Sequence, residues 1–351
     1  MSSPIDKPAL DGLKVADFSR VLAGPLATML LGDLGAEVIK IERPGSGDDT
    51  RSWGPPYSPE GEASYFLAVN RNKRSVVIDL KTGRGRREAK QLALGADVVV
   101  ENFRPGTMES FGLGYEELAE SNPGLVYARI TGFGSKRGAD IPGYDYLVQA
   151  MSGLMSITGE ADGPPMKVGV AVVDVLTGLF TSTGVIAALL ERERSGKGQF
   201  LEISLLGSAL AGLVNQASSF LTGNVVPGRL GMFHPSIAPY EPFRTATEQV
   251  VIAVGNDGQF RSLCSALGLE ELARDERWRS NESRVLHRHE LHEAIEAVLI
   301  EETSQVWIER IRTAGIPCGP INDIEEAFRL ARDLELDPVA VLRRDNGSEV
   351  P

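Results

Sequence analysis

The sequence predicts an α/β fold, with a Rossmann-like parallel sheet in a large domain and a smaller α+β domain after it. Short apolar runs rich in Val and Ile alternate with helical patterns through the first half of the chain, which is typical of βαβ units. At 351 residues the chain is also longer than one hydrophobic core usually grows, which favours two domains. We therefore expect a sheet covered by helices, followed by a second compact unit.

The first half of the chain contains five candidate strands. They are 15–18, 37–41, 75–80, 97–100 and 125–130. Because these strands alternate with helical patterns, they are expected to form right-handed βαβ units and to pair in one parallel sheet. Between the first two, residues 25–34 read as a helix, with Pro25 in its first turn and Gly35 after its end.

The second half continues this pattern and then changes. A long helix follows Asp174, the turn 195–198 ends it, and a strand is expected at 200–205. Residues 224–242 are rich in Pro and Gly and suit a linker or an active-site loop. The domains are therefore predicted as 1–223 (large), 224–242 (linker), 243–320 (small α+β) and 321–351 (a short return segment toward the large domain).

The small unit has its own expected elements. A strand is predicted at 250–254, and helices are predicted at 259–267, 289–301 and 304–314. The turn 315–320 is expected to bring the chain back toward the large domain.

Composition excludes several classes of function. A formal charge of −12 and a pI near 5.0 argue against a nucleic-acid surface, which needs clustered Lys and Arg. Cys264 and Cys318 have no metal-ligand or redox spacing. Three of the four histidines lie in RVLHRHELH and predict a solvated helix face rather than a zinc site or a catalytic triad. No metal is therefore expected.

Membrane and secretory signals are also not expected. The apolar stretch 168–190 is interrupted by Asp174 and by Gly, Ser and Thr, which favours a buried helix over a membrane span. The N-terminal residues show no basic segment leading into an apolar run. A cytoplasmic location is the resulting expectation.

The turn after the first strand, residues 17–25, lacks the G-x-G-x-x-G pattern that lets a dinucleotide pyrophosphate approach the backbone. A nicotinamide cofactor is therefore disfavoured. Arg43 follows Glu42 at the end of the second strand, where it suits a phosphorylated nucleotide or is a solvated surface residue.

Two acidic residues stand out. Asp174 is expected immediately before a helix beginning at Val175, where backbone N–H groups and the helix dipole favour an ionised carboxylate. Such a carboxylate either only caps the helix or acts as a nucleophile toward a thioester. Asp145, between Tyr144 and Tyr146, either caps the helix that follows it or contributes to a site.

Motifs spread over nearly the whole chain resemble those of the class III CoA-transferases, which include formyl-CoA, carnitine and bile-acid CoA-transferases and the related α-methylacyl-CoA racemase. The matching segments are LDGLKV at 10–15, AGP at 23–25, GAEVIKIE at 35–42, NKRS at 72–75, VENFRPG at 100–106, TGFG at 131–134, GPP at 163–165, Asp174, GKGQ at 196–199 and GIPCGP at 315–320.

The resemblance implies that Asp174 is the catalytic nucleophile. CoA would move from an acyl-CoA donor to a carboxylic acid through an aspartyl mixed anhydride and an aspartyl-CoA thioester, without a cofactor. The family's CoA contacts match Val21, Leu22, Ala23, Arg43, Ile78, Lys81, Asn102 and Phe103. Its acyl-pocket positions match Trp53, Tyr65 and Tyr144, with Asp145 beside them.

The resemblance also implies an interlocked homodimer and leaves alternatives. One is an acyl-CoA racemase of the same fold, although Tyr144 stands where the racemase branch has its histidine. Another is a non-catalytic CoA-binding protein. Leu22 replaces a glutamine of the formyl-CoA transferase branch, which disfavours formyl and oxalyl substrates.

Overall fold

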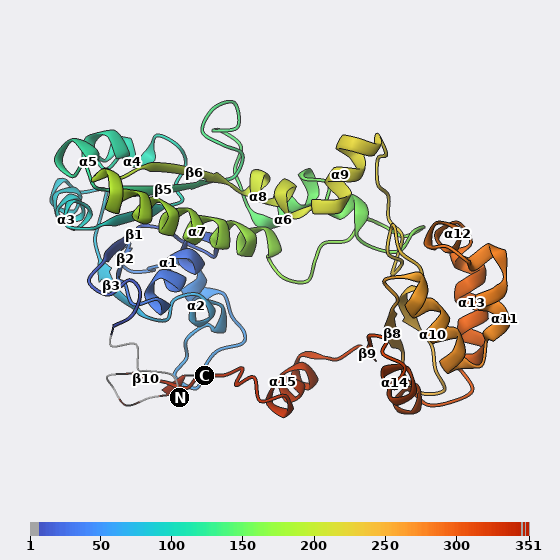
Figure 1. Ribbon diagram of the computed structural model, residues 1–351. Helices are drawn as coiled ribbons and strands as arrows, with labels where there is room; N and C mark the ends of the chain where they lie inside the picture. Colours follow the sequence, from blue (N-terminus) through green and yellow to red (C-terminus); the bar gives the residue numbers. More distant parts are fainter. Residues whose placement is uncertain (1–6, 345–346, 348, 351) are drawn as a thin grey trace. The chain divides into compact units, whose positions relative to one another are not determined.

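The computed structural model describes residues 7–344, 347 and 349–350. Expectations that concern residues 1–6, 345–346, 348 and 351 lie outside the described residues. The described chain divides into two compact units, with the boundary between Arg229 and Leu230. Each unit has a sheet and helices of its own (Figure 1).

Unit 1 is built on a six-stranded sheet in the order β3-β2-β1-β4-β5-β6, in which every neighbouring pair is parallel. The strands are β1 Lys14–Asp17, β2 Glu37–Glu42, β3 Lys73–Val77, β4 Val98–Glu101, β5 Val126–Thr131 and β6 Phe200–Ser204. The predicted parallel α/β sheet is confirmed. Strand order reverses between β1 and β4, and the crevice at such a point is where doubly wound sheets bind ligands.

The helices of unit 1 include those that cover both faces of the sheet. They are α1 Ala23–Asp33, α2 Ser64–Ala68, α3 Gly83–Leu94, α4 Thr107–Ser110, α5 Tyr115–Ser121, α6 Asp145–Met151, α7 Val172–Ser195, α8 Leu205–Gly212 and α9 Val214–Gly223, with 3-10 turns η1 Asp49–Ser52 and η2 Met155–Ile157.

Alternation along the strands decides which helices meet which face. Val98 and Val100 of β4 belong to one core cluster with residues of α1 and α7, whereas Val99 belongs to a second cluster with Ala89 and Ala93 of α3. Successive strand side chains point to opposite faces, so the sheet has a layer of helices on each side. Helices α1 and α7 run beside each other over one face (Figure 1).

Helix α7 is the one helix of the described chain that is long and apolar enough to cross a membrane. It packs against α1, α8, β5 and β6, and Val173, Val185 and Leu189 lie in the core. The expected burial is met on one face of α7 only, because Leu179, Phe180 and Leu190 are exposed. At Gly178 a Cβ would lie 2.8 Å from the backbone oxygen of Ala23, so α7 approaches α1 closely there.

Unit 2 has a three-stranded antiparallel sheet in the order β7-β8-β9 and a core of its own. Its elements are β7 Tyr240–Phe243, β8 Val250–Ala253, β9 Cys318–Pro320, α10 Asp257–Leu267, α11 Glu270–Arg274, η3 Glu276–Trp278, α12 Asn281–Leu286, α13 Arg288–Leu299, α14 Ser304–Thr313, α15 Ile324–Asp333, β10 Leu342–Arg343 and β11 Glu349–Val350.

Two local predictions for unit 2 are wrong. Residues 318–320 form β9 and pair with β8 instead of only turning the chain, because the strand's backbone groups find partners on the exposed edge of β8. His292 is not on a solvated face. Its ring stacks on Phe243 at 4.6 Å and lies between Glu241 and Glu296, because α13 packs this face against β7.

Candidate functional site

A cavity of about 250 Å³ opens at the carboxyl ends of the strands of unit 1. Asp174 lines it, together with Val21, Leu22 and Ala23 from the turn between β1 and α1. Asn102, Phe103 and Tyr144 also line it. We refer to this space as the Asp174 cavity. It brings together residues that lie far apart in the sequence, since Asp174 follows Val21 by 153 positions.

A second cavity, of about 220 Å³, is lined by Arg43, Ile78 and Lys81. We refer to it as the Arg43 cavity. Arg20 and Phe103 line both cavities, and the guanidinium carbon of Arg20 lies 4.8 Å from the centre of the Phe103 ring. All eight residues matched to CoA contacts therefore lie on these two neighbouring cavities.

Arg43 is tied down locally. It donates to Ser46 Oγ at 2.7 Å and forms an ion pair with Asp49. Asp49 also faces Arg20 at 3.8 Å. Two guanidinium groups thus share one carboxylate at the mouth of the cavities, which leaves a net positive charge suited to a phosphorylated ligand.

The turn between β1 and α1 is conformationally unusual. Val21 has φ of 71°, a left-handed conformation that a β-branched residue rarely adopts and that costs on the order of 1–3 kcal/mol. Val21 lies on the wall of the Asp174 cavity. Neighbouring groups must hold this conformation, because Val21 would not adopt it alone.

Asp174 is not the helix cap that the sequence predicts. Helix α7 begins at Val172, so Asp174 is the third residue of the helix. The N–H groups at the helix start are instead accepted by Asp145 Oδ1, at 2.8 Å from Val173 N and 3.3 Å from Asp174 N. Asp145, placed by α6, thus caps a helix that begins 27 residues later in the chain.

The expected charge state of Asp174 is also corrected. Burial, followed by the negative charge of Asp145, raises the pKa of Asp174 from 3.8 to about 7. The side chain is nearly buried, at 9% exposed. Desolvation outweighs the helix dipole here, so near neutral pH the carboxyl exists in both protonation states.

Asp145 is fixed in turn by Gln149, whose Nε2 donates to Asp145 Oδ2 at 2.7 Å. Gln149 Oε1 accepts from Val168 N at 2.9 Å. This amide therefore joins α6, Asp145 and the segment that leads into α7. Because both oxygens of Asp145 accept hydrogen bonds, its negative charge is held beside Asp174.

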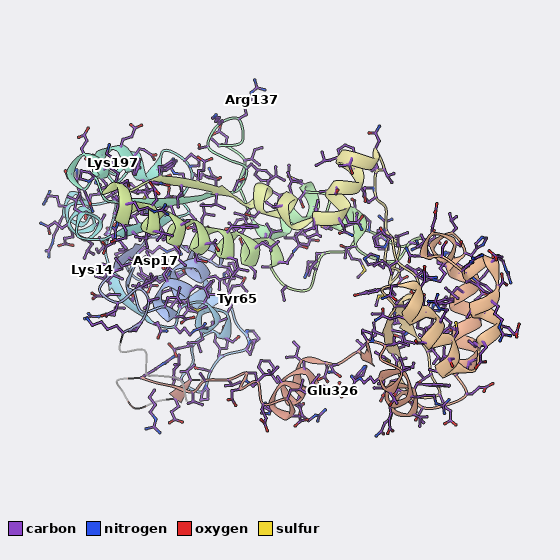
Figure 2. The ribbon with its side chains drawn as sticks, in the orientation of Figure 1. Lys14, Asp17, Tyr65, Arg137, Lys197 and Glu326 are labelled. Atoms are coloured by element: carbon purple, nitrogen blue, oxygen red, sulfur yellow. The ribbon has the colours of Figure 1, made fainter. Side chains whose placement is uncertain are left out.

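The aromatic residues matched to an acyl pocket separate into two groups. Tyr144 is exposed and lines the Asp174 cavity. Trp53 and Tyr65 contact each other edge to face, with ring centres 5.2 Å apart, and neither lines either of the two cavities. Burial and the charges of Asp174 and Asp145 raise the pKa of Tyr65 to about 12. Tyr65 is therefore electrostatically coupled to both acids. It belongs to α2 and is labelled in Figure 2.

Sequence reasoning missed a buried set of charges behind the turn. Lys40 and Lys73 have side chains 2% exposed, and they pair with Asp48 and Asp17, whose side chains are 0% exposed. One signal was available, because Lys40 interrupts the apolar run of β2 between Ile39 and Ile41. A charged residue inside a buried strand requires a partner.

Within the part of the chain that the structure describes, no group of three or more His, Cys, Asp or Glu side chains could hold a metal ion. The fourth histidine, His234, belongs to unit 2, where the centre of its ring lies 5.1 Å from that of Tyr240.

Comparison with known proteins relates this site to a family. The family model described as CoA-transferase family III matches residues 10–350. Succinate–glutarate CoA-transferase of Agrobacterium fabrum is 46% identical, over 99% of this chain and 88% of its own. Succinyl-CoA:glutarate CoA-transferase of Mus musculus is 47% identical, over 93% of this chain and 74% of its own.

A solved structure agrees with these matches. The crystal structure of a CAIB/BAIF family protein from Brucella suis superposes with a TM-score of 0.84 at 40% identity, and it covers 98% of this chain and 94% of its own.

Proposed function

The chain belongs to CoA-transferase family III, and from this membership we propose that it moves CoA between an acyl-CoA and a carboxylic acid through covalent intermediates on Asp174. The activity itself, CoA transfer, is that of the family and of its well-covered relatives. The observation that carries the assignment of Asp174 is its position: a nearly buried carboxyl on the wall of a cavity lined by five of the residues matched to CoA contacts.

The proposed reaction begins when the ionised carboxylate of Asp174 attacks the acyl carbonyl carbon of the donor. The thioester bond breaks, CoA thiolate leaves, and a mixed anhydride remains. The thiolate then attacks the aspartyl carbonyl carbon, which expels the donor acid as a carboxylate and leaves an aspartyl-CoA thioester. The acceptor carboxylate repeats the two steps in reverse order, so no proton, metal or organic cofactor is consumed.

The raised pKa supports this role. A carboxylate that is poorly solvated attacks a carbonyl more readily than one held by water or by strong hydrogen bonds. At pH 7 about half of the enzyme would carry the ionised form, because the pKa of Asp174 is about 7. Burial also protects the anhydride and the thioester from hydrolysis.

For the substrates we propose dicarboxylic acids of the succinate and glutarate class. Two relatives that are 46% and 47% identical to this chain are named for succinate and glutarate. Arg20 and Arg104 line the Asp174 cavity and are able to pair with the second carboxylate of such an acid. Leu22, which replaces the glutamine of the formyl-CoA transferase branch, adds apolar surface in place of a hydrogen-bonding amide.

The state of assembly and the location complete the proposal. We propose a homodimer, as in the family, and a cytoplasmic enzyme. Large apolar side chains are exposed on α9 and α15, which is typical of surfaces that are covered in an assembly; they include Leu221 at 77% and Ile324 at 79%. Light scattering at several concentrations tests the dimer, and cell fractionation tests the location.

The decisive experiment is peptide mass spectrometry after incubation with succinyl-CoA or glutaryl-CoA and trapping with hydroxylamine. A modification at Asp174 that is lost in Asp174→Asn and kept in Asp162→Asn, a substitution of an exposed acid, supports the proposal. Binding of CoA without any adduct would overturn it. Deuterium exchange at the α-carbon without acyl exchange would instead identify a racemase.

A further inference from the structure

The turn that lines the Asp174 cavity is held from behind by side chains of three other segments. Asn102, which follows β4, accepts from Arg20 N at 2.9 Å and donates to Arg20 O at 2.7 Å. Asp48, which follows β2, accepts from Val21 N at 3.4 Å. These bonds fix the backbone on the N-terminal side of the left-handed Val21.

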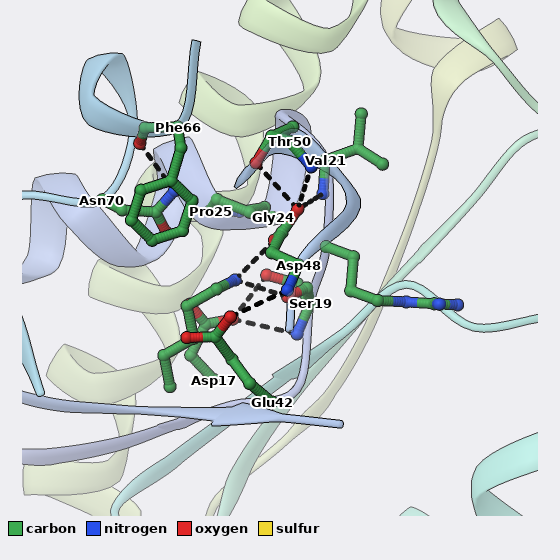
Figure 3. A network of polar contacts seen from close by, with 12 residues as sticks. Asp17, Ser19, Val21, Gly24, Pro25, Glu42, Asp48, Thr50, Phe66 and Asn70 are labelled. Carbon is green, nitrogen blue, oxygen red and sulfur yellow. Dashed lines mark hydrogen bonds and ion pairs between the residues drawn. The ribbon is translucent and has the colours of Figure 1, made fainter. Parts of the chain in front are cut away.

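Lys40 reaches the same turn from β2. Its Nζ donates to Ser19 O at 2.9 Å and lies 2.8 Å from Asp48 Oδ2. Asp48 Oδ1 also accepts from Thr50 N and Oγ1, at 3.0 and 2.8 Å. Lys40 therefore connects the carbonyl of Ser19, two residues before Val21, to the carboxylate of Asp48, which accepts from the Val21 N–H. Figure 3 shows Ser19, Val21 and Asp48 in this network.

Lys73 makes the equivalent connection on the far side of the turn. From the start of β3 its Nζ donates to Pro25 O at 2.8 Å and to Asn70 Oδ1 at 3.0 Å, and it lies 3.1 Å from Asp17 Oδ2. Asp17, at the end of β1, also accepts from Thr28 Oγ1 at 2.7 Å. The two lysines thus bind main-chain carbonyls on either side of Val21.

Stability alone does not account for two buried ion pairs. Removing charges from water costs about as much as the pairs recover, and apolar residues of similar size often serve equally well. Each lysine is already neutralised by an aspartate, so neither offers free charge to a ligand. What remains specific to the two lysines is the pair of backbone carbonyls that they bind, Ser19 O and Pro25 O. These carbonyls flank residues 20–23, which line the cavity.

We propose that Lys40 and Lys73, each paired with a buried aspartate, are positioning residues that hold the Ser19–Pro25 turn in the conformation that receives the CoA part of the substrate. This inference rests on the proposed function, because it assumes that the turn binds CoA. Without the lysines the strained Val21 conformation would be populated only in part, and the apparent dissociation constant would rise by the inverse of that population.

The test compares two variants with a control. The variants are Lys40→Met and Lys40→Met/Asp48→Leu, and the second removes both members of the ion pair so that Asp48 does not remain unpaired. The control is Arg192→Met. Arg192 pairs with Asp97 at 3.0 Å, at the start of β4 and therefore at the opposite end of the sheet. We expect both Lys40 variants to bind CoA about tenfold more weakly in calorimetry, equivalent to ~1.4 kcal/mol, and the Arg192 variant to bind it normally.

Two further readouts separate positioning from a general loss of structure. The KM for succinyl-CoA should rise about tenfold while kcat at saturating donor changes by less than about threefold, because Asp174 itself is untouched. Unchanged CoA affinity in a folded Lys40 variant, or an equal loss in Arg192→Met, overturns the inference.

A further measurement uses the wild-type protein, so its result does not depend on whether a variant folds. Hydrogen exchange without CoA should show slow exchange in a peptide that covers residues 18–24, since the turn is held before the ligand arrives. Fast exchange there overturns the inference. CoA binding is measured independently of chemistry, so failure to find an adduct on Asp174 would affect the proposed function and leave this test intact.

Discussion

Replacing Asp174 with Asn should stabilise the protein at alkaline pH while it removes the nucleophile. The pKa of Asp174 is raised from 3.8 to about 7 by burial and by Asp145. Between these two values the folded protein keeps a proton that the unfolded chain has released. Stability is therefore highest below pH 4 and falls as the pH rises through 7. Asn has no charge to bury at any of these pH values.

The size of the effect follows from the two pKa values. The difference is 7 − 3.8 = 3.2, and one pKa unit corresponds to 1.36 kcal/mol, so the ionised carboxylate costs ~4 kcal/mol at pH 8. We expect Asp174→Asn to raise the free energy of unfolding by up to that amount at pH 8 and by less than ~1 kcal/mol at pH 4. Urea unfolding followed by circular dichroism at both pH values measures it.

The control is Asp162→Asn, which removes one exposed carboxylate from the same unit and should change the unfolding free energy little at either pH. A gain in Asp174→Asn that is the same at pH 4 and pH 8 would show that packing, not charge, is responsible. No gain at pH 8 would mean that Asp174 is better solvated than its burial indicates, and the nucleophile would then have to be activated in another way.

Three further changes test the site and both units. Asp145→Asn removes the negative charge that, after burial, raises the pKa of Asp174. If that pKa falls from about 7 to ~6, kcat/KM at pH 6 should rise up to about fivefold. An unshifted pH profile would contradict the electrostatic coupling between Asp145 and Asp174. Gly178→Ala places a Cβ 2.8 Å from the backbone oxygen of Ala23 and should lower the free energy of unfolding by ~2 kcal/mol. Within a helix, Ala normally stabilises by up to ~1 kcal/mol relative to Gly. A stabilised variant would therefore show that α1 and α7 can move apart. Arg284→Met leaves the carbonyl oxygens of the buried residues Ala238 and Trp278 without their donor and should destabilise unit 2 by about 3 kcal/mol, which urea unfolding would detect.

The sequence by itself determined the architecture of unit 1 and the family. Strands β1, β2, β4, β5 and β6 lie at the predicted positions within about two residues, because buried parallel strands are continuous Val- and Ile-rich runs that need no context to be recognised. Family motifs located Asp174 and the residues matched to CoA contacts, and all of these line the two neighbouring cavities. Local composition was sufficient to predict the strands, whereas the positions of Asp174 and of the CoA contacts followed from the family resemblance.

Only the tertiary structure decided the electrostatics of the site. The sequence predicts that Asp174 caps its own helix and is ionised, yet Asp145 of α6 accepts those N–H groups and its charge opposes ionisation. Lys40 and Lys73 are likewise 33 positions apart in the chain, and only the pairing of β2 with β1 and β3 brings them behind the same turn. Burial and contacts between distant segments set pKa values and hold strained backbone, and these properties arise only when the chain has folded.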